Sequence, residues 1–148
     1  AVETAAEMLA ASRAALPADV AVFAAAVADW RVAAASSEKI KKSGSPPRLE
    51  LVENPDILAT VSRLPAAERP RLVVGFAAET GDVVARARSK RARKGCDWIV
   101  ANDVSGDVMG GIENAVHIVT AEGVEDWPRM KKEEVARRLA ARVAAVFA

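Results

Sequence analysis

The stretch RLVVGFAAETGDVVARARSKRARKGCDWIVAND, residues 71–103, decides the fold class of this chain. It opens with an apolar run of strand length, residues 71–79, and closes with another, residues 96–103. Between the two runs, residues 80–94 predict a helix that is rich in Arg and Lys. Two buried strands joined by a helix are typical of a parallel sheet with right-handed crossovers.

The same alternation continues toward the N-terminus. Residues 4–7, Thr-Ala-Ala-Glu, form a capping-box pattern that predicts the start of a helix, and Pro17 ends it. Residues 20–27, VAVFAAAV, predict another buried strand, and residues 48–53 predict a half-buried one. A short helix is expected from residue 54 on, with Asn54 as its N-cap and Pro55 at its first position.

Toward the C-terminus, residues 105–114 predict a loop and residues 115–130 predict a hairpin that turns at Glu122 and Gly123. A last helix from Lys132 would place Val135, Leu139, Val143 and Val146 on one stripe. We therefore expect a single α/β domain over residues 1–148. Its Rossmann-like, doubly wound sheet would be mostly parallel and would end in a C-terminal hairpin.

Composition narrows the class of protein. The net charge of +1 argues against a general nucleic-acid binder, and no apolar run is long enough to predict a membrane span. The single cysteine, Cys96, excludes an intramolecular disulfide and favours a cytoplasmic location. Because the chain does not begin with Met, we expect it to be a domain of a longer polypeptide.

The predicted strand ends point to a site. Ligands of open α/β sheets bind outside the carboxyl ends of the strands, which here fall at Asp29, at residues 79–80 and at residues 102–103. Asp29 is able to hydrogen-bond a base or ribose, to hold a metal, or simply to form a turn.

The sequence contains two groups of cationic side chains for which it indicates no anionic partner. Arg86, Lys90 and Lys94 recur at every fourth position, and their repulsion destabilises the helix unless an anion lies nearby or water solvates the face. A loop at residues 36–48 carries Lys39 and two further lysines among Gly and Pro residues. It is either a solvated loop or a flap that offers lysines to phosphates.

Several familiar chemistries are disfavoured. His117 and Cys96 are predicted to be structural, and no cluster of Cys and His predicts a metal site. The chain has neither a P-loop nor the G-x-G-x-x-G fingerprint of NAD(P)-binding domains.

Six motifs occur in one order: AAVADWR, EKIKK, ENPDIL, VGFAAET, the Lys90–Lys94 pair and ANDV. As an ordered set along nearly the whole chain, they resemble phosphopantothenate–cysteine ligase, the synthetase half of the bifunctional coenzyme A biosynthesis flavoprotein. The resemblance implies that the carboxylate of 4′-phosphopantothenate attacks CTP, with Mg²⁺, to give an acyl-cytidylate. The amine of L-cysteine then displaces CMP and forms 4′-phosphopantothenoylcysteine.

The resemblance also implies site residues. Lys39 would be the catalytic flap lysine, Asp29 would recognise cytidine, Phe76 would pack against the base or ribose, and Lys90 and Lys94 would contact the nucleotide. The metal ligands stay unknown. The full nucleotide-binding set is Phe23, Ala24, Ala25, Asp29, Lys39, Asp56, Ile57, Leu58, Ala59, Phe76, Lys90 and Lys94.

One departure from the family shapes the remaining expectations. The family begins with a strand, a Gly-rich turn and an SN-x-SSG-x-MG segment, none of which occurs here. We therefore expect an incomplete catalytic domain that binds nucleotide weakly by itself, with a mobile loop at residues 38–46. FMN would belong to the decarboxylase half, which this chain lacks.

The resemblance further implies a homodimer, with subunit contacts predicted on the hairpin at residues 115–127. No nucleic-acid or membrane partner is expected. The alternative function is a noncatalytic nucleotide-binding or dimerisation module of Rossmann type.

Overall fold

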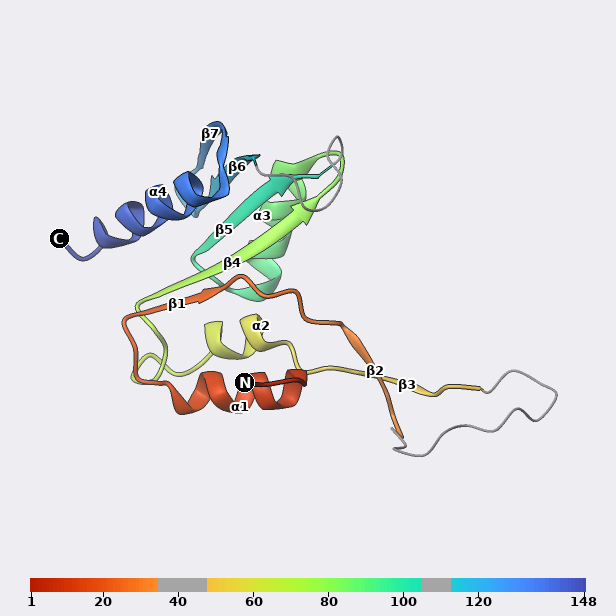
Figure 1. Ribbon diagram of the computed structural model, residues 1–148. Helices are drawn as coiled ribbons and strands as arrows, with labels where there is room; N and C mark the ends of the chain where they lie inside the picture. The colour runs from red at the N-terminus through yellow and green to blue at the C-terminus, as the bar shows by residue number, and fades with distance from the viewer. Residues whose placement is uncertain (35–47, 105–112) are drawn as a thin grey trace.

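A computed structural model describes residues 1–34, 48–104 and 113–148 of the chain. Its centre is a five-stranded sheet with the strand order β1-β4-β5-β6-β7 (Figure 1). β1 (Val20–Phe23), β4 (Leu72–Glu79) and β5 (Trp98–Asp103) run parallel, and β6 (Glu113–Val119) and β7 (Val124–Lys131) continue the sheet as an antiparallel hairpin. The predicted α/β fold with a C-terminal hairpin is confirmed.

The strand–helix–strand unit at residues 71–103 folds as predicted, except at the start of its helix. α3 (Val83–Lys94) begins three residues later than expected because the Asp82 carboxylate accepts the Ala85 N–H at 3.1 Å and so caps the first turn. Gly95 ends the helix with φ 76°, a left-handed conformation that glycine adopts without strain. Residues 80–81, where the sequence placed the start of the helix, therefore lie outside it.

Helices cover both faces of the sheet, as a doubly wound fold requires. On one face, α2 (Ile57–Ser62) and α3 bury a core that includes Val61, Ala77, Ala87 and Ile99. On the other face, α4 (Lys132–Ala144) packs Val135 and Leu139 against the sheet. Val143 packs beside them as predicted, whereas Val146 lies beyond the end of α4 and is 40% exposed.

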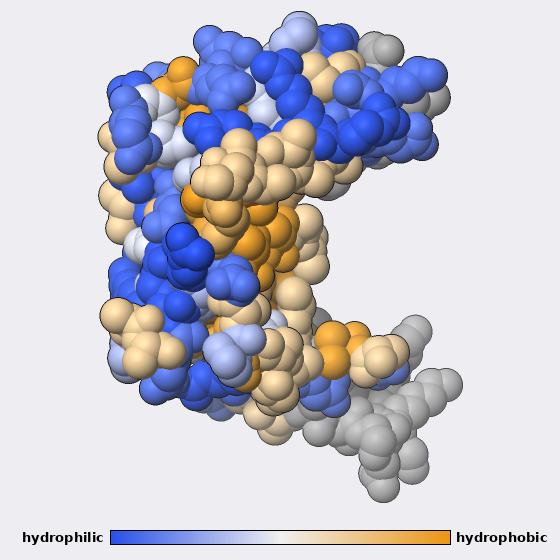
Figure 2. All heavy atoms as spheres, turned by 90° about the vertical axis from the view of Figure 1, so that its left-hand side faces the viewer, coloured by the Kyte–Doolittle hydropathy of each residue, from blue (hydrophilic) through white to orange (hydrophobic). Residues whose placement is uncertain are grey.

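β1 is shorter and less buried than expected. It ends at Phe23 rather than at Val27, and in the described part of the chain it pairs with β4 alone. Val22 is consequently 48% exposed. Figure 2 shows this side of the molecule, which is hollowed, with apolar side chains gathered at the height of β1 between α4 and α1. Asp29 therefore follows a loop, residues 24–29, and does not end the strand.

β2 (Trp30–Val32) and β3 (Leu51–Glu53) form a separate antiparallel pair that projects from the body of the molecule (Figure 1). β2 was not predicted because three residues show no periodicity, and β3 is shorter than the predicted residues 48–53. Three large apolar side chains on this arm are more than half exposed, namely Trp30, Leu49 and Leu51.

The remaining elements follow the sequence closely. In the capping box of α1 (Ala5–Ala14), Thr4 and Glu7 exchange two hydrogen bonds of 3.1 Å, and the helix packs against α2. The β6–β7 turn closes with a 2.9 Å hydrogen bond from the Thr120 N–H to the Gly123 carbonyl, as predicted. None of the described helices is long and apolar enough to cross a membrane.

Candidate functional site

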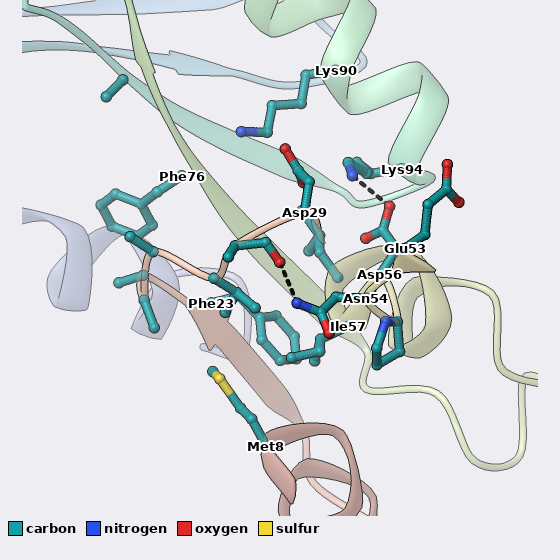
Figure 3. A pocket seen from close by; sticks show the side chains of 18 of the residues that line it. Met8, Phe23, Asp29, Glu53, Asn54, Asp56, Ile57, Phe76, Lys90 and Lys94 are labelled. Atoms are coloured by element: carbon teal, nitrogen blue, oxygen red, sulfur yellow. Dashed lines mark hydrogen bonds and ion pairs between the residues drawn. The ribbon is translucent and has the colours of Figure 1, made fainter. Parts of the chain in front are cut away.

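A cavity of about 760 Å³ opens at the carboxyl ends of the parallel strands. Its walls come from α1, the loop at residues 24–29, the base of the β2–β3 arm, the start of α2, and α3 (Figure 3). Most of the predicted nucleotide-binding residues line it: Phe23, Ala24, Ala25, Asp29, Asp56, Ile57, Leu58, Phe76, Lys90 and Lys94. Strand ends that are remote in sequence thus meet at one edge, as the fold class predicts.

The apolar part of the cavity is built where β1 and β4 end. Phe23 packs with the core under α2 and α3, whereas Phe76 packs with the core under α4, so the two rings border the cavity from opposite faces of the sheet. Gly75 lets α2 come close to the sheet, because a Cβ there would lie 2.5 Å from Leu58 Cδ2. These surfaces suit a flat, weakly polar group such as a nucleobase.

The cationic wall comes from α3, and its members are not equivalent. Lys90 and Lys94 both line the cavity, but Lys94 forms an ion pair with Asp56 and its side chain is only 14% exposed. Lys90 forms none of the ion pairs found among the described residues. Arg86, the third cation of the predicted face, instead lies 3.6 Å from the Glu79 carboxylate and outside the cavity. Of the two predicted lysines on α3, Lys90 is therefore the one whose charge no described residue pairs.

Asp56 has two structural partners. One carboxylate oxygen accepts the Ala59 N–H at 3.0 Å and caps α2, and the other accepts the Lys94 ammonium. Burial opposes ionisation of this carboxyl, but the hydrogen bonds and the charges of Lys94 and Arg93 outweigh it, so the pKa of Asp56 lies below its ordinary 3.8. The N-cap is thus Asp56 rather than the predicted Asn54, since α2 begins at Ile57.

Asn54 instead holds the loop at residues 24–29. Its side-chain amide donates to the Ala28 carbonyl at 2.9 Å, and its backbone N–H donates to the Asp29 carbonyl at 2.8 Å. Figure 3 shows the Asp29 carboxylate and the Lys90 ammonium directed into the same opening. The site therefore sets the Asp29 carboxylate beside apolar walls and near the Lys90 ammonium, which forms no ion pair with the described residues.

Two predicted residues are not placed at the cavity. Ala59 does not line it, and its N–H donates to the Asp56 carboxylate that caps α2. Lys39, and with it the predicted mobile loop at residues 38–46, lies outside the described residues.

Sequence reasoning did not assign several of the lining residues to the site, namely Met8, Trp30, Glu53, Asn54, Pro55 and Arg93. Asn54 had been predicted only as a helix cap. Met8 carried no signal, because its contact depends on how α1 packs. Trp30 and Asn54 did stand inside recognised motifs, and their polar or aromatic character was the available signal. Asn102, placed by the sequence at a strand end without a role, lines the cavity.

The two other residues singled out by the sequence are structural, as expected. His117 Nδ1 lies 2.6 Å from Asp126 Oδ1 on the hairpin, away from the cavity. Cys96 is 2% exposed, and burial raises the pKa of its thiol, so a reactive thiolate is disfavoured. Within the described ranges, no three His, Cys, Asp or Glu side chains gather into a metal-binding group.

Comparison with known proteins identifies relatives of the chain. The coenzyme A biosynthesis bifunctional protein CoaBC of Haemophilus influenzae is 44% identical over 116 residues, which are 78% of this chain and 28% of that protein. CoaBC of Escherichia coli is 46% identical over 114 residues, 74% of this chain and again 28% of that protein. The chain thus spans less than a third of the length of these relatives.

A crystal structure of the C-terminal domain of a CoaBC protein superimposes with a TM-score of 0.74 at 29% identity, covering 99% of this chain and 64% of that one. The sequence profile of the DNA/pantothenate metabolism flavoprotein C-terminal domain matches residues 1–147. This agrees with the resemblance found in the six sequence motifs. The chain belongs to the DNA/pantothenate metabolism flavoprotein C-terminal domain family.

Proposed function

We propose that this chain is part of a phosphopantothenate–cysteine ligase, which joins 4′-phosphopantothenate to L-cysteine at the expense of CTP in coenzyme A biosynthesis. One observation carries the proposal: residues matching the family's nucleotide motifs, far apart in sequence, line a single cavity at the carboxyl edge of the sheet. The relatives, named as coenzyme A biosynthesis proteins, support the pathway. Because the chain spans 28% of their length, the activity is proposed for the whole protein.

The reaction has two balanced steps. A carboxylate oxygen of 4′-phosphopantothenate attacks the α-phosphorus of CTP, and the bond to pyrophosphate breaks. The cysteine amine then attacks the acyl carbon of the mixed anhydride, loses a proton and expels CMP. Both steps develop negative charge on phosphate oxygens, which fixed cations stabilise best in a site that excludes water.

The cavity divides these tasks among its residues. Phe23 and Phe76 offer apolar surface for the base or ribose, and Asp29 offers an acceptor for the amino group of cytosine. Lys90 is the cation proposed to meet the phosphates directly. Lys94, held by Asp56, fixes α3 relative to α2 beside the nucleotide.

Magnesium would enter with the nucleotide. Proteins often hold Mg²⁺ through one or two carboxylates together with substrate phosphates, and the described part of the cavity offers carboxylates but no three-residue metal cluster. The ion would neutralise triphosphate charge. Lys39 is proposed as the catalytic lysine of a flap that covers the anhydride, and FMN is assigned to the other half of the bifunctional protein.

We also propose that the protein is a cytoplasmic homodimer. The β2–β3 arm favours this assembly more strongly than the β6–β7 hairpin does, because Trp30, Leu49 and Leu51 expose apolar surface on it. Such surface on a projecting arm is typical of a protein contact. A mass at monomer size across micromolar concentrations, measured by light scattering, would count against the dimer.

Nucleotide binding separates the proposal from its alternatives. Thermal shift or calorimetry with CTP, ATP and NADH, run side by side on the protein at its natural length, should give the largest stabilisation with CTP. Preference for NADH would favour a dinucleotide-binding domain. CTP binding without any turnover of 4′-phosphopantothenate would favour the noncatalytic nucleotide-binding module.

A further inference from the structure

Asn54 occupies a place that neither helix capping nor the proposed ligand contacts explain. It lies between β3 and α2 on the wall of the cavity, and Asp56 performs the capping that its position in the sequence suggested. Its side-chain amide is directed away from α2, toward the loop at residues 24–29 (Figure 3). A polar side chain at a cavity wall that binds a neighbouring loop is suited to fixing the shape of that loop.

The loop at residues 24–29 depends on this residue. All six of its residues are exposed, and they belong to no helix or strand. Among the hydrogen bonds formed by described residues, those that reach this loop come from Asn54, one to the Ala28 carbonyl at 2.9 Å and one to the Asp29 carbonyl at 2.8 Å. These two carbonyls belong to the peptide planes on the two sides of Asp29, so one residue restricts both planes.

A second residue holds Asn54 in turn. The Arg31 guanidinium donates to the Glu53 carbonyl and lies 3.5 Å from Asn54 Oδ1. This orients the amide so that its NH₂ group faces Ala28. Downstream, Pro55 leads directly into Asp56, whose carboxylate binds Lys94. Asn54 therefore joins the Asp29 loop to the rigid corner formed by α2 and α3.

We propose that Asn54 is a positioning residue for Asp29, and that it directs the Asp29 carboxylate into the cavity opposite Lys90. The inference rests on the proposed function, in which Asp29 recognises the amino group of cytosine. Asn54 acts through the loop backbone and needs no contact with the nucleotide. Removal of the Asn54 side chain should therefore act mainly on the ratio of kcat/KM for CTP to that for UTP. Its effect on the free energy of unfolding should be the smaller one.

The test compares kcat/KM for CTP and UTP in the protein at its natural length. Asn54→Ala should lower the CTP preference about tenfold, the factor that corresponds to one net hydrogen bond. Asn54→Asp, which keeps the shape but loses the donor, should do the same. In an Asp29→Ala background, Asn54→Ala should change the preference less than twofold, because effects through one shared residue are not additive.

Thr60→Val is the matched control. It also removes a side-chain-to-backbone hydrogen bond, of 2.7 Å to the Asp56 carbonyl, from a residue beside the site that does not line the cavity. It should leave the CTP preference unchanged. An equal loss of preference in Thr60→Val and Asn54→Ala, or the same tenfold loss with and without Asp29, would overturn the positioning role.

A second readout does not depend on the nucleotide. The Asn54 backbone N–H donates to the Asp29 carbonyl. Hydrogen exchange of this N–H therefore reports on whether the loop at residues 24–29 stays in place. Asn54→Ala should speed exchange at residue 54 at least tenfold, whereas Thr60→Val should not. If the wild-type protein does not use CTP, the proposed function fails, and unchanged exchange at residue 54 would separately refute the positioning role.

Discussion

Replacing Asp56 should destabilise the chain in two separable amounts. Its carboxylate caps α2 through the Ala59 N–H and also pairs with Lys94. Loss of an N-cap destabilises a protein by about 1 kcal/mol. The ion pair adds roughly another 1 kcal/mol, at the upper end for surface pairs, because the Lys94 side chain is 14% exposed while that of Asp56 is 42% exposed.

Substitutions at Asp56 and Lys94 separate the contribution of the helix cap from that of the ion pair. Asp56→Ala should lower the free energy of unfolding by about 2 kcal/mol, roughly 4–8 °C in Tm for a chain of this size. Asp56→Asn keeps the capping oxygen and should lose about 1 kcal/mol. A double-mutant cycle with Lys94→Met should give a coupling energy of about 1 kcal/mol, measured by urea unfolding.

The coupling should depend on pH in one direction. The pKa of Asp56 is depressed in the folded chain from its ordinary 3.8, so the stabilisation is complete above that value and is lost as pH falls through the folded pKa. The exposed Glu134–Arg137 pair of α4 provides a matched control, with a coupling of about 0.5 kcal/mol or less. If Asp56→Asn is as destabilising as Asp56→Ala, or if the cycle shows no coupling at pH 7, the assigned geometry is wrong.

Three further substitutions test other parts of the structure. Lys90→Ala should weaken CTP binding tenfold or more, measured by calorimetry. It should shift the free energy of unfolding by less than about 0.5 kcal/mol, because the Lys90 ammonium has no ion-pair partner among the described residues. Arg88→Ala, on the exposed part of α3, is the control and should change neither quantity. Ile99→Ala, at a fully buried position, should lower the free energy of unfolding by about 2–5 kcal/mol in urea, and a loss below 1 kcal/mol would contradict the packed core. Asp97→Asn should lose about 2 kcal/mol in the same assay, since its carboxylate accepts Arg69 at 2.8 Å and the Val73 N–H at 2.7 Å; an unchanged midpoint would show that these bonds are not formed.

Much of the fold was predictable because its signals are local. The apolar runs of β4 and β5, the Thr4–Glu7 capping box and the stripe on α4 each follow from neighbouring residues. The β2–β3 arm was not predictable, because its three-residue strands are defined by pairing across a gap of eighteen residues between Val32 and Leu51. The start of α2 was misplaced since Asn54 and Asp56 are both good caps, and tertiary contacts decide between them.

Most residues that the sequence assigned to the site line one cavity, but the sequence did not distinguish how each of them is held. Sequence motifs brought Phe23, Asp29 and Phe76 to one place, yet they presented Lys90 and Lys94 as equivalent. The ion pair between Lys94 and Asp56 distinguishes them, and it depends on how α2 packs against α3. Contacts of this kind arise from packing between elements and leave no pattern in a single sequence.

The central claim is tested most directly by the products formed from CTP. The protein at its natural length, given CTP, Mg²⁺, 4′-phosphopantothenate and L-cysteine, should release one pyrophosphate and one CMP for each 4′-phosphopantothenoylcysteine, as measured by mass spectrometry and a pyrophosphate assay. Without cysteine, pyrophosphate release should stop near one per site, with an acyl-cytidylate bound. Hydrolysis of CTP that ignores 4′-phosphopantothenate, or ligation that proceeds without any nucleoside triphosphate, would contradict the account.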